Sequence, residues 1–213
     1  MKNVWLRVEF AAIFVIAPIM MAVFLPPTWL FPILFGVTAV GFVLLHFTIG
    51  FAWRSLFVRA DEVDLILCAL FIAATAVTCF VVMWLFQRDM MFVLVRERPI
   101  VLVFIIVLYP VLSALPQELV YRVLYFERYA DILPKDIKSN LMLNASLFGL
   151  AHLMYWHAIP ILMTFFGGLV FAYSYKMKLN FLEAWFLHSV AGIILFVFGM
   201  GAYFYSGNVV RPF

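Results

Sequence analysis

The sequence predicts an all-α fold, a polytopic transmembrane bundle of about seven to eight helices, and three observations support this. Apolar residues make up 68% of the 213-residue chain and charged residues only 12%, whereas a soluble domain is roughly half apolar and about a quarter charged. The mean hydropathy of +1.13 excludes a disordered chain, which combines low hydrophobicity with high charge. Apolar runs of about 20 residues, the length that crosses a bilayer, alternate with short polar breaks. Transmembrane β-barrels instead use segments of about ten residues.

Seven apolar runs are predicted to span the membrane. Their approximate bounds are 8–25, 30–52, 63–86, 99–116, 140–156, 158–176 and 181–205. The first run follows Lys2 and Arg7 like a signal peptide, but it passes into two prolines without a small-residue cleavage site, so we expect it to be retained as a span. The alternative is an eighth, re-entrant or interfacial helix around 117–131, which would shift the count of cytoplasmic cations. Without a linker or an internal repeat, residues 1–213 are predicted to form a single integral membrane domain.

The distribution of cations predicts the orientation. With the N-terminus in the cytoplasm, ten Lys and Arg residues, Arg122 among them, fall inside and four fall outside, as the positive-inside rule favours. We therefore expect an integral protein of a bacterial inner (plasma) membrane with a cytoplasmic N-terminus. The formal charge of +3 is too small to indicate nucleic acid as a partner. The expected partners are the lipid bilayer and a membrane-associated peptide or protein substrate.

Polar side chains within the spans are the informative ones, because charges inside a membrane are costly and usually functional or paired. The first such place is the end of the fourth run. Glu118 and Arg122 are four residues apart, so on a helix they share a face and can pair. Pro116 suits the first turn of a new helical segment, where the helix dipole would favour the Glu118 carboxylate. Taken alone, the pair can equally be an interfacial salt bridge that holds a helix end.

Two histidines mark the other places. Asn144, Phe148 and His152 recur every four residues in the fifth run and would form one stripe on a helix. His188 lies in the last run, with Ser189 beside it. Either histidine alone can be a packing residue with one hydrogen bond. Together with Glu118 and Arg122, they predict one polar site facing the inside of the bundle.

A carboxylate and an imidazole can together deprotonate water near neutral pH, and a second imidazole can donate to an oxyanion, which suits amide hydrolysis. Glu118, His152 and His188 also have the composition of a catalytic zinc triad. The two-histidine spacing of soluble zinc proteases is absent, so the sequence leaves open a divalent metal such as zinc or no cofactor at all.

Three motifs resemble those of the CPBP (Abi) family, intramembrane proteases related to the type II CAAX prenyl endopeptidases. They are Gln-Glu-x-x-x-Arg at 117–122, Phe-x-x-x-His at 148–152 and a histidine in a later helix, His188. The motif-bearing core is about 99–205. The resemblance implies an enzyme, an intramembrane endopeptidase that hydrolyses a peptide bond of a membrane-associated substrate, which can be a prenylated one. The family is often labelled metalloprotease, and a carboxylate mechanism without metal is also proposed for it.

Residue by residue, the resemblance implies that Glu118 is the acid/base carboxylate and Arg122 its orienting partner. It implies that His152 polarises the attacking water and that His188 stabilises the oxyanion. Gln117, Phe148 and Asn144 would be accessory residues, and a metal, where one is used, would be bound by Glu118, His152 and His188.

Two residues depart from the family pattern. The first motif commonly begins with a glutamate that serves as catalytic base, whereas this chain has Gln117, which cannot act as a general base. The third motif commonly has an asparagine four residues after its histidine, whereas this chain has Gly192. Asn144 is a candidate to replace that carboxamide. These departures leave two alternatives: a non-catalytic relative acting as a membrane scaffold or immunity-type protein, and, less favoured without matched halves, a proton-coupled transporter.

Overall fold

The computed structural model describes residues 2–212, with side chains from Val4 onward, and this part of the chain is helical without strands. Seven long helices correspond to the seven predicted runs, which confirms the predicted fold class. They are 2–23 (α1 Lys2–Ala11, a π-helical segment Ala12–Ile16, α2 Ala17–Val23), Pro27–His46 (containing α3, Leu30–His46), α4 Leu65–Phe86, Pro99–Arg128, α8 Ile137–Ala151, α9 Ala158–Lys176 and α10 Phe181–Val197. The short helices α5 (Val93–Glu97) and α11 (Gly201–Phe204) lie in the connections.

Five of the long helices are long and apolar enough to cross a membrane, and the chain is an integral membrane protein. Their outward faces carry exposed large apolar side chains, such as Ile66 and Phe104 at 74% and 60% exposure, which suit contact with lipid tails. The predicted spans 140–156 and 181–205 are too long. Helix α8 has 15 residues and ends before His152, and α10 has 17 and ends at Val197.

The helix Pro99–Arg128 corrects the sequence prediction at Pro116. No new helix begins there: α6 (Pro99–Tyr109), a π-helical segment (Pro110–Ala114), α7 (Leu115–Glu118) and a second π-helical segment (Leu119–Arg128) form one continuous helix. The alternative of a separate eighth helix around 117–131 is therefore excluded, and the helix N-terminus expected near Glu118 is wrong. A proline removes one backbone hydrogen bond, and the π register absorbs that disruption. The carbonyl of Pro110 also accepts a hydrogen bond from another helix, because the indole of Trp185 in α10 donates to it at 2.7 Å.

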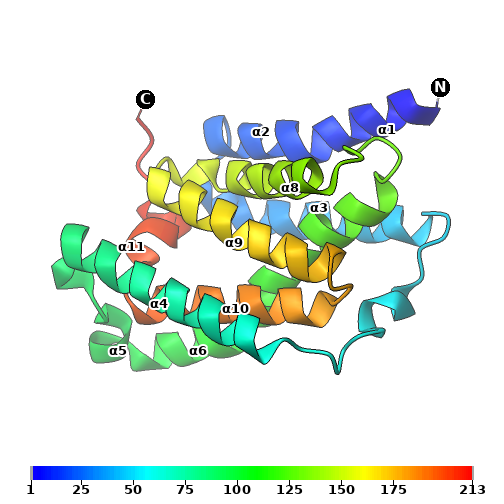
Figure 1. Ribbon diagram of the computed structural model, residues 1–213. Helices are drawn as coiled ribbons and strands as arrows, with labels where there is room; N and C mark the ends of the chain where they lie inside the picture. Colours follow the sequence, from blue (N-terminus) through cyan, green and yellow to red (C-terminus); the bar gives the residue numbers. More distant parts are fainter. Residues whose placement is uncertain (1, 213) are drawn as a thin grey trace.

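The long helices run alternately between two ends of the bundle, and the chain termini lie at opposite ends (Figure 1). Helix α9 packs against both α8 and α10, and α10 also contacts α4 and α6. The Leu119–Arg128 segment passes through the middle of the main core cluster, where Val123, Leu124 and Tyr125 are fully buried. Arg122 is also fully buried, so it does not belong among the loop cations used to predict orientation.

The N-terminal helices are attached to this central helix by an ion pair. Arg128 donates from Nη2 to Glu9 of α1 at 2.8 Å and from Nη1 to the carbonyl of Leu44 in α3 at 3.2 Å. The hydroxyl of Tyr129 donates to the same Glu9 carboxylate at 2.6 Å. One arginine therefore holds α1, α3 and the end of the long helix together.

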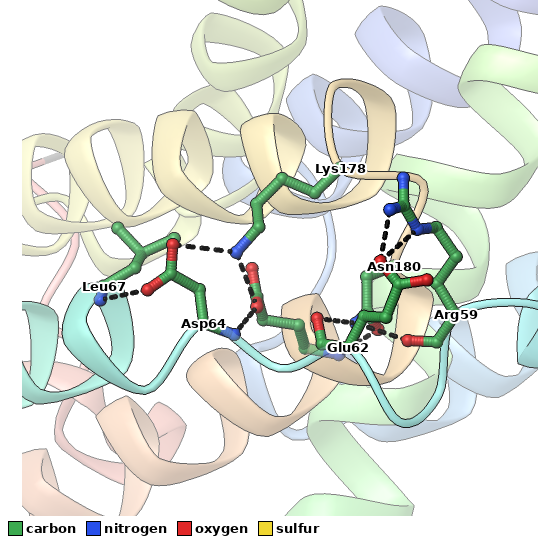
Figure 2. Close-up of polar contacts among 7 residues, drawn as sticks. Arg59, Glu62, Asp64, Leu67, Lys178 and Asn180 are labelled. Carbon is green, nitrogen blue, oxygen red and sulfur yellow. Dashed lines mark hydrogen bonds and ion pairs between the residues drawn. The ribbon is translucent and has the colours of Figure 1, made fainter.

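A second polar cluster connects the loop before α4 with the turn between α9 and α10. Lys178 lies 3.2 Å from Asp64 and 2.8 Å from Glu183, whose side chain is fully buried (Figure 2). Asn180 donates to the loop carbonyls of Arg59 and Glu62 at 2.7 and 3.0 Å (Figure 2). The cluster fixes the N-terminus of α10, the helix that carries His188.

Candidate functional site

Glu118, Arg122 and His188 form a buried polar cluster at the centre of the bundle. Glu118 and Arg122 are 0% exposed, and their ion pair spans 3.2 Å between Oε2 and Nε, one helical turn apart. His188, brought in by α10, places Nδ1 2.8 Å from Oε1 of Glu118. A carboxylate buried in this way is stabilised only by such partners. The structure therefore brings together three of the four residues predicted to be catalytic.

Arg122 is held by aromatic rings and by Asn144. Its guanidinium carbon lies 4.7 Å from the ring centre of Phe148 and 5.7 Å from that of Phe171, within cation–π range. Asn144 is fully buried, accepts a hydrogen bond from Nη1 of Arg122 and donates to the carbonyl of Tyr121 at 2.6 Å. Asn144 thus has a different part from the one expected: it orients Arg122 and does not replace a carboxamide beside His188.

His152 directly follows α8 as its C-cap residue and is half-buried. Its Nδ1 lies 2.8 Å from the backbone carbonyl of Phe148, which can only accept, so the Nδ1 atom carries the proton and Nε2 is left as an acceptor. The Phe148 ring lies edge-on between the two imidazoles, with centroid distances of 4.9 Å to His152 and 5.5 Å to His188. The two histidines therefore share one aromatic neighbour, while their Nδ1 atoms are bonded to different partners, the carbonyl of Phe148 and the carboxylate of Glu118.

The presence of glycine at position 192 has a steric explanation. A Cβ atom at this position would overlap the ring of Tyr109, which packs against the α10 backbone. Tyr109 also lies edge-on to His188, with a centroid distance of 6.1 Å. The space beside His188 that a side chain at position 192 would need is thus filled by the tyrosine ring.

A cavity of about 120 Å³ lies between the N-terminal helices and the long helix. Most of its apolar wall comes from the first two long helices, with Val120, Ala151 and Met154 completing it. Its polar groups come from Ser113, Gln117, His152, Tyr121 and Tyr155. Gln117 donates from Nε2 to the carbonyl and the hydroxyl of Ser113, at 3.1 and 3.0 Å. Because only an amide NH₂ can donate to that carbonyl, Oε1 is the free acceptor of this side chain. Of the adjacent residues Gln117 and Glu118, the glutamine therefore lines the cavity and the glutamate lies in the core.

The donor set does not fit a metal ion. Among the described residues, no group of three or more His, Cys, Asp and Glu side chains is arranged to hold one. Both oxygens of Glu118 face other partners, His188 and Arg122, and the adjacent guanidinium would repel a cation. The predicted triad of Glu118, His152 and His188 is therefore not arranged as a coordination shell.

A model of the type II CAAX prenyl endopeptidase Rce1-like family matches residues 99–204, the segment that carries the cluster and both histidines. The chain belongs to this family. Membership confirms the resemblance found in the motifs and identifies the chain as a member of a protease family. No match was found among curated proteins or among solved structures.

Sequence reasoning missed several residues of the site. Tyr109, Ser113 and Tyr155 lie in or beside apolar segments, where a hydroxyl gives no signal of its own. Most of the apolar wall of the cavity, including Met21 and Leu34, lies outside the segment that matches the Rce1-like family. Only the packing of the N-terminal helices on the long helix reveals these residues as neighbours of His152.

Proposed function

We propose that the chain is an intramembrane endopeptidase that hydrolyses a peptide bond of a membrane-associated substrate, with His152 as the base that activates water. The observation that carries this proposal is the position of His152. It lines the cavity with its Nε2 atom available as an acceptor, because Nδ1 is bonded to the carbonyl of Phe148. Membership of the Rce1-like protease family supports the reaction class.

The hydrolysis needs a base that deprotonates water and a group that positions the water. Nε2 of His152 takes a proton from water as the water oxygen attacks the carbonyl carbon, and the carbonyl electrons move to its oxygen. When the tetrahedral intermediate collapses, the C–N bond breaks and the imidazolium returns the proton to the leaving amine. The Gln117 carboxamide oxygen can accept a hydrogen bond from the second O–H of the water and so hold the nucleophile in place. Tyr155 lines the same cavity with its ring stacked on His152, and we infer that its hydroxyl donates to the developing oxyanion.

In this mechanism, Glu118 and His188 have an orienting role and do not react with the substrate. Glu118 is fully buried between Arg122 and His188, which supports an orienting role in place of direct contact with water. The carboxylate accepts a hydrogen bond from Nδ1 of His188 and so fixes the orientation of the imidazole ring beside Phe148.

The test is cleavage of a quenched-fluorescent single-span peptide library by purified protein in proteoliposomes. His152→Ala is expected to lower cleavage by roughly 10²- to 10⁴-fold, the range attributed to general acid–base groups. His46→Ala is the matched control, because His46 is exposed at the end of α3 and away from the cavity. Full cleavage by His152→Ala would overturn the assignment.

A second candidate is a non-catalytic member of the family that acts as a membrane scaffold or immunity-type protein. The observation that favours it is the cavity lining, where Gln117 stands in place of a carboxylate while Glu118 is sealed in the core. A cellular phenotype that wild type and the double variant His152→Ala/His188→Ala restore equally would support this candidate against the protease.

A further inference from the structure

A row of polar side chains follows one face of the long helix Pro99–Arg128. Tyr109, Ser113 and Gln117 succeed one another at intervals of four residues. In an α-helix each such step would rotate the side chain by about 40°. The π-helical segment Pro110–Ala114 has a wider turn, which counteracts that drift. The three side chains therefore stay on one face and can contact each other in turn.

These contacts form a chain of hydrogen bonds. Nε2 of Gln117 donates to the carbonyl and to the hydroxyl of Ser113, at 3.1 and 3.0 Å. The Ser113 hydroxyl is in turn hydrogen-bonded to that of Tyr109. Since Oγ of Ser113 accepts from Gln117, its own hydrogen is available for the Tyr109 oxygen. Two acceptors of one residue therefore face the amide nitrogen of Gln117, and Oε1 is left for the cavity.

Tyr109 is fixed against α10. A Cβ atom at Gly192 would overlap both the ring and the hydroxyl of the tyrosine, so glycine allows the ring to lie on the helix backbone. The ring is also edge-on to His188 and to Phe196, with a centroid distance of 6.1 Å in each case. One end of the hydrogen-bonded row is thus anchored on the helix that carries His188, and the other faces the cavity that contains His152.

We propose that Ser113, supported by Tyr109, is a positioning residue that keeps Oε1 of Gln117 directed into the cavity. This proposal rests on the proposed function, in which that oxygen holds the attacking water. Only Oε1 can accept a hydrogen bond from the water, because the NH₂ group of a carboxamide can only donate. Ser113 acts through Gln117, and Tyr109 acts through Ser113.

The first test is cleavage in proteoliposomes of one peptide that wild type cleaves. Ser113→Ala is expected to lower kcat about two- to tenfold, the range that one hydrogen bond contributes, with little change in KM. Ser113→Thr keeps the hydroxyl and should restore most of kcat. In a Gln117→Ala background, Ser113→Ala should cause no further loss. Ser146→Ala is the matched control, because the Ser146 hydroxyl donates to the carbonyl of Met142 on the exposed face of α8.

The second test observes the carboxamide directly. Gln87 and Gln117 are the two glutamines of the chain, so selective ¹⁵N labelling of glutamine gives two side-chain NH₂ signals in NMR spectra of the full-length protein in detergent micelles. The variant Gln87→Ala assigns them. Ser113→Ala, and Tyr109→Phe with its ring retained, are expected to shift the Gln117 signal and to leave the Gln87 signal unchanged.

A Gln117 signal that does not move in either variant would overturn the proposal. Equal losses of kcat from Ser113→Ala in the wild-type and Gln117→Ala backgrounds would do the same, as would a loss in Ser113→Thr as large as that in Ser113→Ala. The proposed function fails separately: the expected shift of the Gln117 signal in a protein whose wild type cleaves no peptide would retain the placement of the carboxamide and reject the protease.

Discussion

The Nδ1 atom of His188 lies 2.8 Å from the Oε1 atom of Glu118, although 70 residues separate them in the sequence. The contact joins α10 to the long central helix inside a fully buried environment. It places the imidazole on a carboxylate whose other oxygen faces Arg122 at 3.2 Å. The three side chains form a single unit, so removing one member changes the electrostatics of the other two.

Arg122→Met is expected to destabilise the fold by about 3–5 kcal/mol, because it leaves Glu118 as a buried charge with no cationic partner. Thermal unfolding in detergent micelles measures the loss. The double variant Glu118→Gln/Arg122→Met removes both charges and should recover a large part of the stability. A single variant as stable as wild type would contradict the view that the pair holds the core together.

Gly192→Ala is expected to destabilise the fold by about 1–3 kcal/mol, the usual cost of overpacking, since a Cβ atom there overlaps the Tyr109 ring. Tyr109→Ala in the same chain should relieve the overlap and reduce the additional cost of Gly192→Ala to near zero. Gly36→Ala is the control, because nothing lies within 4 Å of its Cβ position. Unfolding temperatures of the single and double variants check the coupling, and purely additive losses would contradict it.

The sequence predicts the fold better than it predicts the site. Apolar runs suffice to place the seven helices, because each must match the thickness of a bilayer. The four-residue spacing of Glu118 and Arg122 predicts their pairing, because helical periodicity is local. The side on which Gln117 lies depends on which face of the helix meets α3, and that is a tertiary property. The sequence wrongly predicts a new helix at Pro116. A helix start has a recognisable capping pattern, whereas a π-helical segment within a continuous helix has none.

Arg128→Met is expected to loosen α1 and α3 from the long helix, because it removes the partner of Glu9 and the donor to Leu44. The loss is expected to be about 1–3 kcal/mol for a partly buried, multiply bonded ion pair. Since α3 supplies part of the cavity wall, cleavage of a membrane substrate should fall as well. Arg54→Met, at an exposed position, should change neither unfolding temperature nor cleavage. Equal unfolding temperatures and equal cleavage for the two variants would contradict the view that Arg128 holds α1 and α3 on the long helix.

The Asp64–Lys178 contact predicts acid sensitivity. The backbone N–H of Leu67 and the Lys178 ammonium hold the pKa of Asp64 below its ordinary value of 3.8. A depressed pKa contributes stability that is present above the ordinary value and is lost as the pH falls through the lowered one. The unfolding temperature of wild type should therefore drop more between pH 5 and pH 3 (about one unit on either side of the ordinary value) than that of Asp64→Asn. Parallel curves for the two proteins would contradict the prediction.

Gln117→Glu tests the proposed chemistry most directly. The new carboxylate would lie in the cavity beside His152, where it can take a proton from water, which the carboxamide cannot do. It would also lose the donor to the carbonyl of Ser113, at a cost of about 1–3 kcal/mol in stability.

We expect Gln117→Glu to cleave the fluorescent peptide library up to about tenfold faster than wild type at neutral pH, with a lower unfolding temperature. Gln117→Ala is the control, and it should lower cleavage because neither oxygen acceptor remains. Cleavage by Gln117→Ala equal to that by Gln117→Glu would show that position 117 does not orient the water. Cleavage by Gln117→Glu from an inactive wild type would instead identify the natural chain as the non-catalytic relative, since its cavity would then lack only the carboxylate.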